Sequence, residues 1–130
     1  MRGRPVVPGR ARGEVVVIES ISFYGDVDPN TGTLRDGRSI GGKVLVARRS
    51  KGSTVGPYVM YALRRRGKAP LAILLVSKSD PVLVSGAVLS ETVLVDGLPE
   101  DIMKLRDGEI VQVLEDGAVI LEGGTAQPLT

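Results

Sequence analysis

The stretch KVLVARRSKGSTVGPYVMYALRRRGKAPLAILLV, residues 43–76, decides the fold. An apolar run from Lys43 to Ala47 is typical of a buried strand, and the strongest helical pattern of the chain follows from about Thr54 to Arg66. Leu71 to Val76 is a second apolar run suited to a strand that is buried on both faces. The stretch therefore predicts a β-loop-α-β unit with two parallel strands and a right-handed crossover.

The predicted helix has signals at both ends. Ser53 or Thr54 can cap its start, and Pro57 falls in the first turn, where a missing N–H costs little. The run Arg64–Arg66 suits the negative end of the helix dipole, and Gly67 is a natural stop. Four apolar residues at helical spacing are expected to face a sheet: Val55, Val59, Ala62 and Leu63.

Further elements are predicted on both sides of this unit. Before it lie a strand over Glu14 to Glu19 and a long polar loop over Ser20 to Gly42. After it come a short helix capped by Asp80 and begun by Pro81, a strand over Thr92–Val95, a helical turn over Pro99–Leu105, and a hairpin of Ile110–Leu114 and Ala118–Leu121. The sequence predicts a compact single-domain α/β fold over residues 13–125, preceded by an irregular, solvated basic arm over residues 1–12.

Composition limits the chemistry that this chain can perform alone. Its 130 residues fit one domain, and 42% of them are apolar, which is enough for a core. The sequence contains no Cys and no His, so thiolate chemistry, Cys-ligated metal sites and the usual neutral-pH proton shuttle are excluded within it. Acid–base catalysis must then use Asp, Glu, Lys, Tyr, an activated Ser or Thr, or another chain.

Charge and hydropathy argue against nucleic acid and membrane as partners. A net charge of +2 is too small to imply nucleic acid, although a basic arm over residues 1–12 leaves an RNA-associated protein as an alternative. Leu71 to Val76, the longest apolar run, is far shorter than the ~20 residues that span a bilayer. No apolar segment follows the first arginines, so we expect a soluble, cytoplasmic protein.

The loop between the first predicted strand of the unit and its helix is the candidate site. Lys51, Gly52, Ser53 and Thr54 lie where free backbone N–H groups and the positive end of the helix dipole point outward. Arg49 adds positive charge, so the loop suits a carboxylate, a phosphate or a developing alkoxide. The simpler interpretation is that Ser53 or Thr54 only caps the helix.

Five segments in order resemble the small subunit of the aconitase X family, a swivelling β/β/α domain. The resemblance covers roughly residues 13–114. The segments are Ser22-Phe23-Tyr24-Gly25-Asp26-Val27-Asp28-Pro29-Asn30-Thr31-Gly32, Gly42-Lys43-Val44-Leu45-Val46, Lys51-Gly52-Ser53-Thr54-Val55-Gly56-Pro57-Tyr58-Val59, Ala69-Pro70-Leu71-Ala72-Ile73 and Asp80-Pro81-Val82-Leu83-Val84-Ser85-Gly86-Ala87.

The resemblance implies a hydro-lyase that is active only with a large subunit, in a heterodimer or a larger assembly. Ser53 would accept a proton, and Lys51, Gly52, Thr54 and Arg49 would bind the substrate. In members with a separate small subunit it implies dehydration of (R)-5-phosphomevalonate, a small phosphorylated hydroxy acid, to trans-anhydromevalonate 5-phosphate in a modified mevalonate route to isoprenoids. A [4Fe–4S] cluster would belong to the large subunit, with no cofactor or metal in this chain.

Three alternatives stay open at this point. A related dehydratase could act on another hydroxy acid, such as cis-3-hydroxyproline. A non-catalytic domain could bind an anion at the same helix terminus, and the basic arm could bind RNA. The roles of the loop acids Asp26, Asp28 and Asp36 are also open. Asp28 stands before Pro29, where an Asp is often a simple turn former, and the family often has His-Pro where Gly37-Arg38 follows Asp36.

Overall fold

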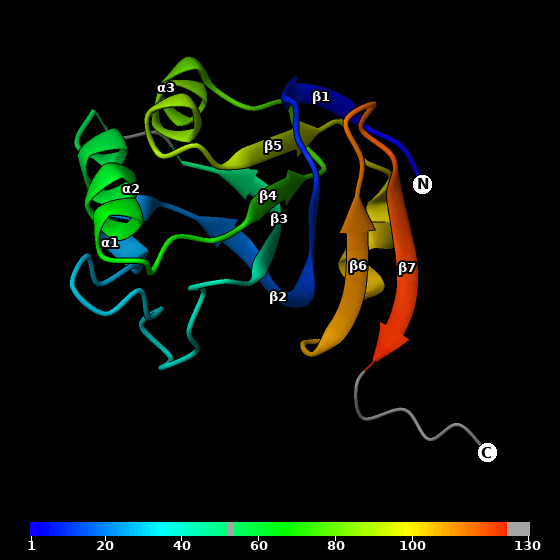
Figure 1. Cartoon of the computed structure of the whole chain (residues 1–130), viewed down its shortest axis with the longest axis horizontal. Coiled ribbons are helices and arrows are strands. Elements are labelled where there is room, and N and C mark those ends of the chain that lie inside the picture. Colours follow the sequence, from blue (N-terminus) through cyan, green and yellow to red (C-terminus); the bar gives the residue numbers. More distant parts are fainter. Residues whose placement is uncertain (52–53, 125–130) are drawn as a thin grey trace.

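The computed structural model describes residues 1–51 and 54–124. A seven-stranded mixed sheet forms its centre, and α1, α2 and α3 lie together on the side away from the β6–β7 hairpin (Figure 1). The elements are β1 (Arg4–Val7), β2 (Ala11–Ile21), α1 (Phe23–Asp26), β3 (Val44–Ser50), α2 (Gly56–Arg65), β4 (Ala72–Leu75), α3 (Pro81–Leu89), β5 (Val93–Asp96), the 3-10 helix η1 (Glu100–Lys104), β6 (Glu109–Val113) and β7 (Val119–Gly124). The predicted α/β class is confirmed.

The centre of the sheet is parallel. Strand order is β1-β5-β4-β3-β2-β6-β7, and β2, β3, β4 and β5 all run in the same direction. The four residues of β4 are all buried, as are Val44 to Ala47 of β3, because helices cover one face and the curled part of the sheet covers the other. The β-loop-α-β unit predicted over residues 43–76 is present as β3, α2 and β4.

β2 joins the two parts of the sheet. Its first residues pair antiparallel with β6, starting at Ala11 opposite Val113, and its second half pairs parallel with β3, starting at Val15 opposite Val44. β6 and β7 form the predicted hairpin, whose turn contains Gly117 at a φ of 87°. Because one long strand serves both partners, the sheet curls and carries the hairpin across one face of the central strands (Figure 1).

The central strands separate two hydrophobic cores. Successive residues of β3 point to opposite faces, so Leu45 and Ala47 enter the core under the helices, whereas Val44 and Val46 enter the core under the hairpin. The helix-side core includes Phe23, Val59, Met60, Leu63 and Leu83; the hairpin-side core includes Leu98, Ile102, Val111, Val113 and Val119. Both faces of the central strands are therefore covered.

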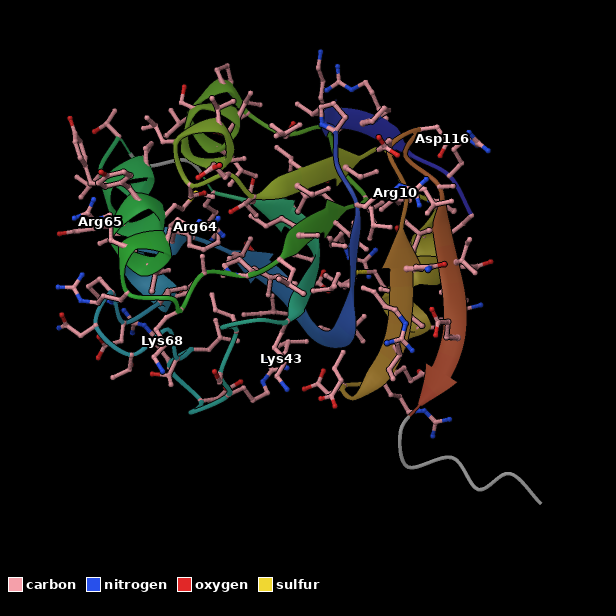
Figure 2. The ribbon with its side chains drawn as sticks, in the orientation of Figure 1. Arg10, Lys43, Arg64, Arg65, Lys68 and Asp116 are labelled. Atoms are coloured by element: carbon pink, nitrogen blue, oxygen red, sulfur yellow. The ribbon has the colours of Figure 1, made fainter. Side chains whose placement is uncertain are left out.

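Residues 1–12 belong to the sheet, so the expectation of an irregular, solvated arm is wrong. β1 pairs antiparallel with β5, and Arg2 forms a bridge with Ala118 just before β7. Arg10 lies beside the hairpin, and Asp116 lies in its turn (Figure 2). The arginines of the segment form ion pairs: Arg2 with Asp116, Arg4 with Asp96, Arg10 with Glu115 and Arg12 with Glu122. These pairs occupy the charges on which RNA binding by an arm would depend.

α2 and α3 form where the sequence predicts helices, but the start of α2 differs from the prediction. Asp80 caps α3 by accepting a hydrogen bond from the Leu83 N–H at 2.9 Å, as predicted. α2 starts two residues later than expected, with Val55 as its N-cap and no side-chain cap, so Thr54 does not cap it. Val59 and Leu63 are buried as predicted and Met60 joins them, whereas Val55 is 42% exposed.

Gly86 allows α2 and α3 to pack closely. A Cβ at Gly86 would overlap Met60 Sδ and lie 3.3 Å from Pro57 Cα. We expect Gly86→Ala to lower the free energy of unfolding by about 1 kcal/mol, because overpacking outweighs the helix propensity gained. Gly56→Ala, where a Cβ would meet only Phe23 Cβ at 4.0 Å, is the control and should be neutral or stabilising. Urea denaturation measures both, and a stabilised Gly86→Ala variant would contradict the close contact.

Candidate functional site

The candidate site lies at the carboxyl edge of the parallel strands. β3 ends at Ser50, and the chain passes from there into the loop that leads to α2. α3 starts at the same edge after β4, so the amino-terminal ends of both helices meet there (Figure 1). Open α/β sheets bind their ligands at this edge, because helix amino termini and loop backbones converge on it.

The structure places three of the five predicted site residues. Arg49 is exposed near the end of β3, Lys51 is exposed just after it, and Thr54 is exposed just before α2. Gly52 and Ser53 lie outside the described residues, so the structure gives the positions of Lys51 and Thr54 on either side of the predicted catalytic serine. The Lys51 N–H donates to the Ile21 carbonyl at 2.9 Å, which ties the start of the loop to the end of β2.

Positive charge at this edge comes from Arg49 and Lys51 and not from the neighbouring Arg48. Arg48 pairs with Glu19 and Glu100, so its charge is compensated inside the chain. Arg49 and Lys51 form no ion pair within residues 1–51 and 54–124. These two side chains are therefore available to an anion at the loop.

A small, mainly apolar pocket adjoins the loop. It lies between the ends of β2 and β3, helix α1 and the first turns of α2 and α3, and Ser50 and Lys51 form its polar margin. It is lined by Ile21, Phe23, Ser50, Lys51, Gly56, Pro57, Met60, Val82 and Leu83. With a volume of about 10 Å³ the pocket has room for about one water molecule, so it forms an apolar margin of the loop rather than a cavity for a ligand.

Ser50 and Asp80, which the sequence did not single out as a pair, hold the end of β3 beside the start of α3. The Ser50 hydroxyl donates to Asp80 Oδ2 at 3.0 Å, while Asp80 Oδ1 accepts from the Leu83 N–H. One carboxylate thus caps α3 and holds the end of β3 beside it. The cap could be predicted from the Asp-Pro sequence, but the contact with Ser50, 30 residues away, could not.

Asp96 fixes the segment that precedes Asp80. Its side chain is only 2% exposed, and it accepts hydrogen bonds from the Ser79 N–H and hydroxyl, both at 2.7 Å. Arg4 donates from Nε and Nη2 at 2.9 and 2.7 Å. Burial raises the pKa of Asp96, but the hydrogen bonds from Arg4 and Ser79 and the charge of Arg4 outweigh it and lower the pKa to about 2. The amino-terminal strand is thereby connected to the site edge.

The loop acids have structural partners. Asp26 accepts from the Ser22 N–H at 2.8 Å, and Asp28 accepts from the Asn30 N–H at 2.8 Å. Hydrogen bonds from the side chain and backbone of Arg38 lower the pKa of Asp36. An open hollow lined by residues 25–30 and 33–35 lies beside the first two acids.

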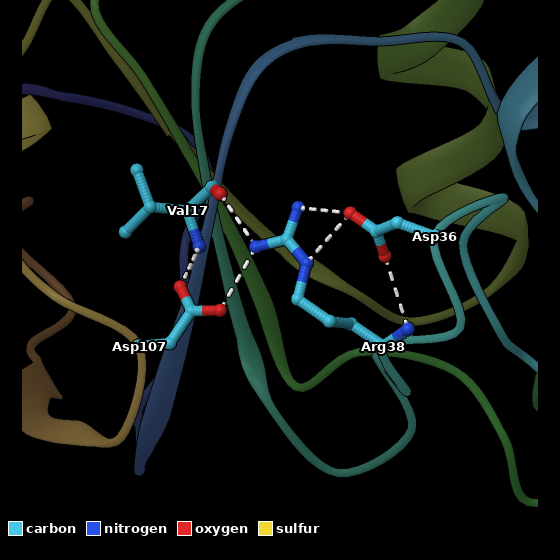
Figure 3. Close-up of polar contacts among 4 residues, drawn as sticks. All are labelled: Val17, Asp36, Arg38 and Asp107. Carbon is cyan, nitrogen blue, oxygen red and sulfur yellow. Dashed lines mark hydrogen bonds and ion pairs between the residues drawn. The ribbon is translucent and has the colours of Figure 1, made fainter.

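Arg38 anchors the long loop to β2. It donates to the Val17 carbonyl at 2.8 Å and to Asp107 at 2.9 Å, while Asp107 accepts from the Val17 N–H at 2.9 Å (Figure 3). Asp36 completes the cluster. Arg38 and Asp107 thus form hydrogen bonds with the backbone of β2 at Val17, beyond the residues of β2 that pair with β6. This part of the loop therefore has a structural role.

Metal-binding chemistry is not built into the described part of the chain. No three Asp or Glu residues in it gather closely enough to hold a metal ion, and the sequence contains no Cys or His. These residues therefore do not fit a [4Fe–4S] cluster, which needs thiolate or comparable ligands. No helix within residues 1–51 and 54–124 has the length and apolar character needed to cross a bilayer.

A parallel sheet with helices on one face and a curled hairpin on the other defines the class of swivelling β/β/α domains. The family model described as the aconitase X swivel domain matches residues 1–121. This chain belongs to that family.

Relatives and solved structures agree over nearly the whole chain. It is 50% identical to the phosphomevalonate dehydratase small subunit of Aeropyrum pernix, covering 94% of this chain and 92% of the relative. The protein of the same name from Thermococcus kodakarensis is 47% identical, covering 95% and 98%. The crystal structure of Thermococcus kodakaraensis aconitase X in its holo-form is 43% identical and covers 92% of this chain and 95% of that chain, with a TM-score of 0.83.

Proposed function

We propose that this chain is the small subunit of a two-chain hydro-lyase that converts (R)-5-phosphomevalonate into trans-anhydromevalonate 5-phosphate and water. The main support is the similarity to relatives named phosphomevalonate dehydratase small subunit, eight of which are 43–50% identical to this chain. The position of the loop supports it as well, because the loop and two helix amino termini share one sheet edge with a small pocket.

The reaction needs a base and an anion site. The C–H bond next to the carboxylate breaks, its electron pair forms the new double bond, and the tertiary hydroxyl leaves as hydroxide. The hydroxide takes up one proton to become water, and the proton that the base accepted is released again, so that the reaction balances and the base is restored. We assign the proton to Ser53, which would act as an alkoxide between Lys51 and Thr54. A serine is nearly inert as a base without electrostatic support, and the cations and helix terminus beside this loop would supply it.

Binding of the substrate falls to the residues around Ser53. Arg49 and Lys51 are exposed and would pair with the carboxylate or the phosphate. Gly52 would leave the backbone open to the substrate, and the Thr54 hydroxyl would donate a hydrogen bond. We assign any [4Fe–4S] cluster to the large subunit, because the residues of this chain do not fit one.

Lys51→Ala tests the anion site. We expect KM for phosphomevalonate to rise about tenfold to a hundredfold, because a charge-assisted hydrogen bond to the substrate is lost. Lys104→Ala, which removes an exposed lysine of η1 outside the candidate site, is the control and should leave KM within twofold. Steady-state kinetics of the assembled enzyme give both values, and equal KM values for the two variants would remove Lys51 from the site.

Anaerobic reconstitution tests the function itself. The small chain and its large subunit are assayed separately and together with (R)-5-phosphomevalonate, and the product is identified by NMR. We expect turnover only when both are present, with trans-anhydromevalonate 5-phosphate as product. Full activity of the large subunit alone, or no dehydration by the pair, would overturn the proposal.

A further inference from the structure

α3 is a surface helix without any charged residue. Its sequence, Pro81 to Leu89, is apolar except for Ser85 and Gly86, yet Val88 and Leu89 are 60% and 53% exposed. A helix that is apolar on all sides is normally covered on all sides, because a solvated face usually carries polar residues. The outer face of α3 therefore has the composition of a contact surface.

The neighbouring side of α2 continues this surface. Pro57, Tyr61 and Arg64 lie on one stripe at i, i+4 and i+7, and both ends of the stripe reach α3: Pro57 beside Gly86, and Arg64 Nη2 at 3.8 Å from Glu91 Oε1 just after α3. Tyr61 thus borders the line along which the helices touch. Tyr58 and Tyr61, on the outer side of α2, are 73% and 46% exposed.

The matching stripe of α3 lies across the same line. Val82 lines the pocket together with Pro57, Gly86 packs on Met60, and Leu89 follows at the next helical position. We name the surface formed by Pro57, Tyr61, Val82 and Leu89, with Tyr58 and Val88 beside it, the helix seam. Because Pro57 and Val82 also line the pocket, the seam is continuous with the candidate site.

The charges around the seam are mainly positive, with Asp80 at the start of α3 and Glu91 just after its end as the acidic exceptions. Between Asp36 and Asp80 the sequence contains no acidic residue and ten basic ones: Arg38, Lys43, Arg48, Arg49, Lys51, Arg64, Arg65, Arg66, Lys68 and Lys78. Arg64 and Arg65 lie on α2, with Lys68 just beyond it, away from the hairpin (Figure 2). Within residues 1–51 and 54–124, no ion pair involves Arg65, Arg66 or Lys68, in contrast to the paired arginines of the amino-terminal segment.

We propose that the helix seam is the surface on which the large subunit docks, and that the facing surface of the large subunit offers apolar sockets bordered by carboxylates. This inference rests on the proposed function, which supplies the partner. Exposed tyrosines beside uncharged aliphatic side chains are typical of the centre of an interface, and a mainly basic rim steers a partner of opposite charge. With the large subunit bound to the seam, the pocket and the adjoining loop lie between the two chains.

Leu89→Glu tests the seam, with Leu121→Glu as the matched control. Both leucines are about half exposed, at 53% and 49%, and Leu121 lies on β7, far from the seam. Calorimetric titration with the purified large subunit should show at least tenfold weaker binding for Leu89→Glu and a change within twofold for Leu121→Glu. Thermal melting verifies that both variants are folded. Equal affinities of the two variants would overturn the proposal.

Arg65→Glu tests the charged rim. The association rate constant with the large subunit should fall at least threefold at low salt, and the difference should shrink as salt rises. Arg106→Glu changes an exposed arginine between η1 and β6 and should leave that rate unchanged. If the association rate constant does not change with either substitution or with salt, the large subunit does not present an acidic surface to the seam, and that part of the proposal is wrong.

Activity separates this proposal from the proposed function. For Leu89→Glu, turnover lost at low concentration of the large subunit should return when that subunit is in excess. If Leu89→Glu binds the large subunit normally in an active complex, the docking proposal is wrong and the proposed function is unaffected. Weakened pairing in a complex that never dehydrates phosphomevalonate supports the seam and overturns the function. Sedimentation equilibrium shows whether the chain alone self-associates. If it does, and if Leu89→Glu abolishes this self-association, the seam binds a second copy of the chain and the proposal is overturned.

Discussion

Ser53→Ala is expected to lower kcat of the assembled enzyme at least about a hundredfold, the usual loss for a general base. Alanine cannot take the proton from the carbon next to the carboxylate, and this chain contains no His that could replace Ser53. KM should change little, because Arg49 and Lys51 still bind the anionic ends of the substrate. Steady-state kinetics under anaerobic conditions measure both constants.

Ser39→Ala is the matched control for this experiment. Ser39 is an exposed serine in the long loop, and its removal should leave kcat within twofold. Ser53→Ala should also bind the large subunit with unchanged affinity, which separates a chemical role from a role in pairing. A kcat near that of the unmodified enzyme would show that another group accepts the proton.

Arg4→Ala is expected to lower the free energy of unfolding by about 2 kcal/mol at pH 7. Arg4 and Ser79 hold the pKa of Asp96 at about 2, below its ordinary 3.8, and each unit is worth about 1.4 kcal/mol. Without Arg4 the buried carboxylate keeps only the hydrogen bonds from Ser79, and its pKa rises. Urea denaturation at pH 7 gives the difference.

The pH dependence gives this prediction a definite sign. The folded pKa of Asp96 lies below the unfolded one, so its stabilisation is complete above about pH 4 and is lost as pH falls towards 2. The difference between the unmodified chain and Arg4→Ala should therefore shrink over that range. Arg2→Ala removes an ion pair whose two side chains are both more than half exposed, and it should change stability by less than about 0.5 kcal/mol. A difference that is independent of pH would contradict the role of Asp96.

Local patterns predicted the elements whose signals lie within one segment. The unit over residues 43–76 could be predicted because its apolar runs and helical spacing are contiguous. Asp80-Pro81 marked the start of α3, and Glu115-Asp116-Gly117 marked the hairpin turn. In each case the residues that determine the structure are neighbours in sequence.

Non-local pairing explains what the sequence did not predict. β1 contains Arg4 and Pro5 and has no strand pattern of its own. It forms by pairing with β5 and by the contact between Arg4 and Asp96. The contact between Ser50 and Asp80 likewise depends on two strand ends that become neighbours only in the folded sheet. The residues of the loop were predicted as a site from local pattern and family resemblance, and the role of Ser53 stays a prediction.

The distance between Ser53 Oγ and the carbon that loses its proton is the most direct test of the proposed catalytic loop. It can be measured in a crystal structure of both subunits with bound substrate. We predict about 3–3.5 Å, with Arg49 and Lys51 at the anionic groups. A Ser53 hydroxyl directed into the core of this chain, or out of the space between the subunits, would contradict the proposal.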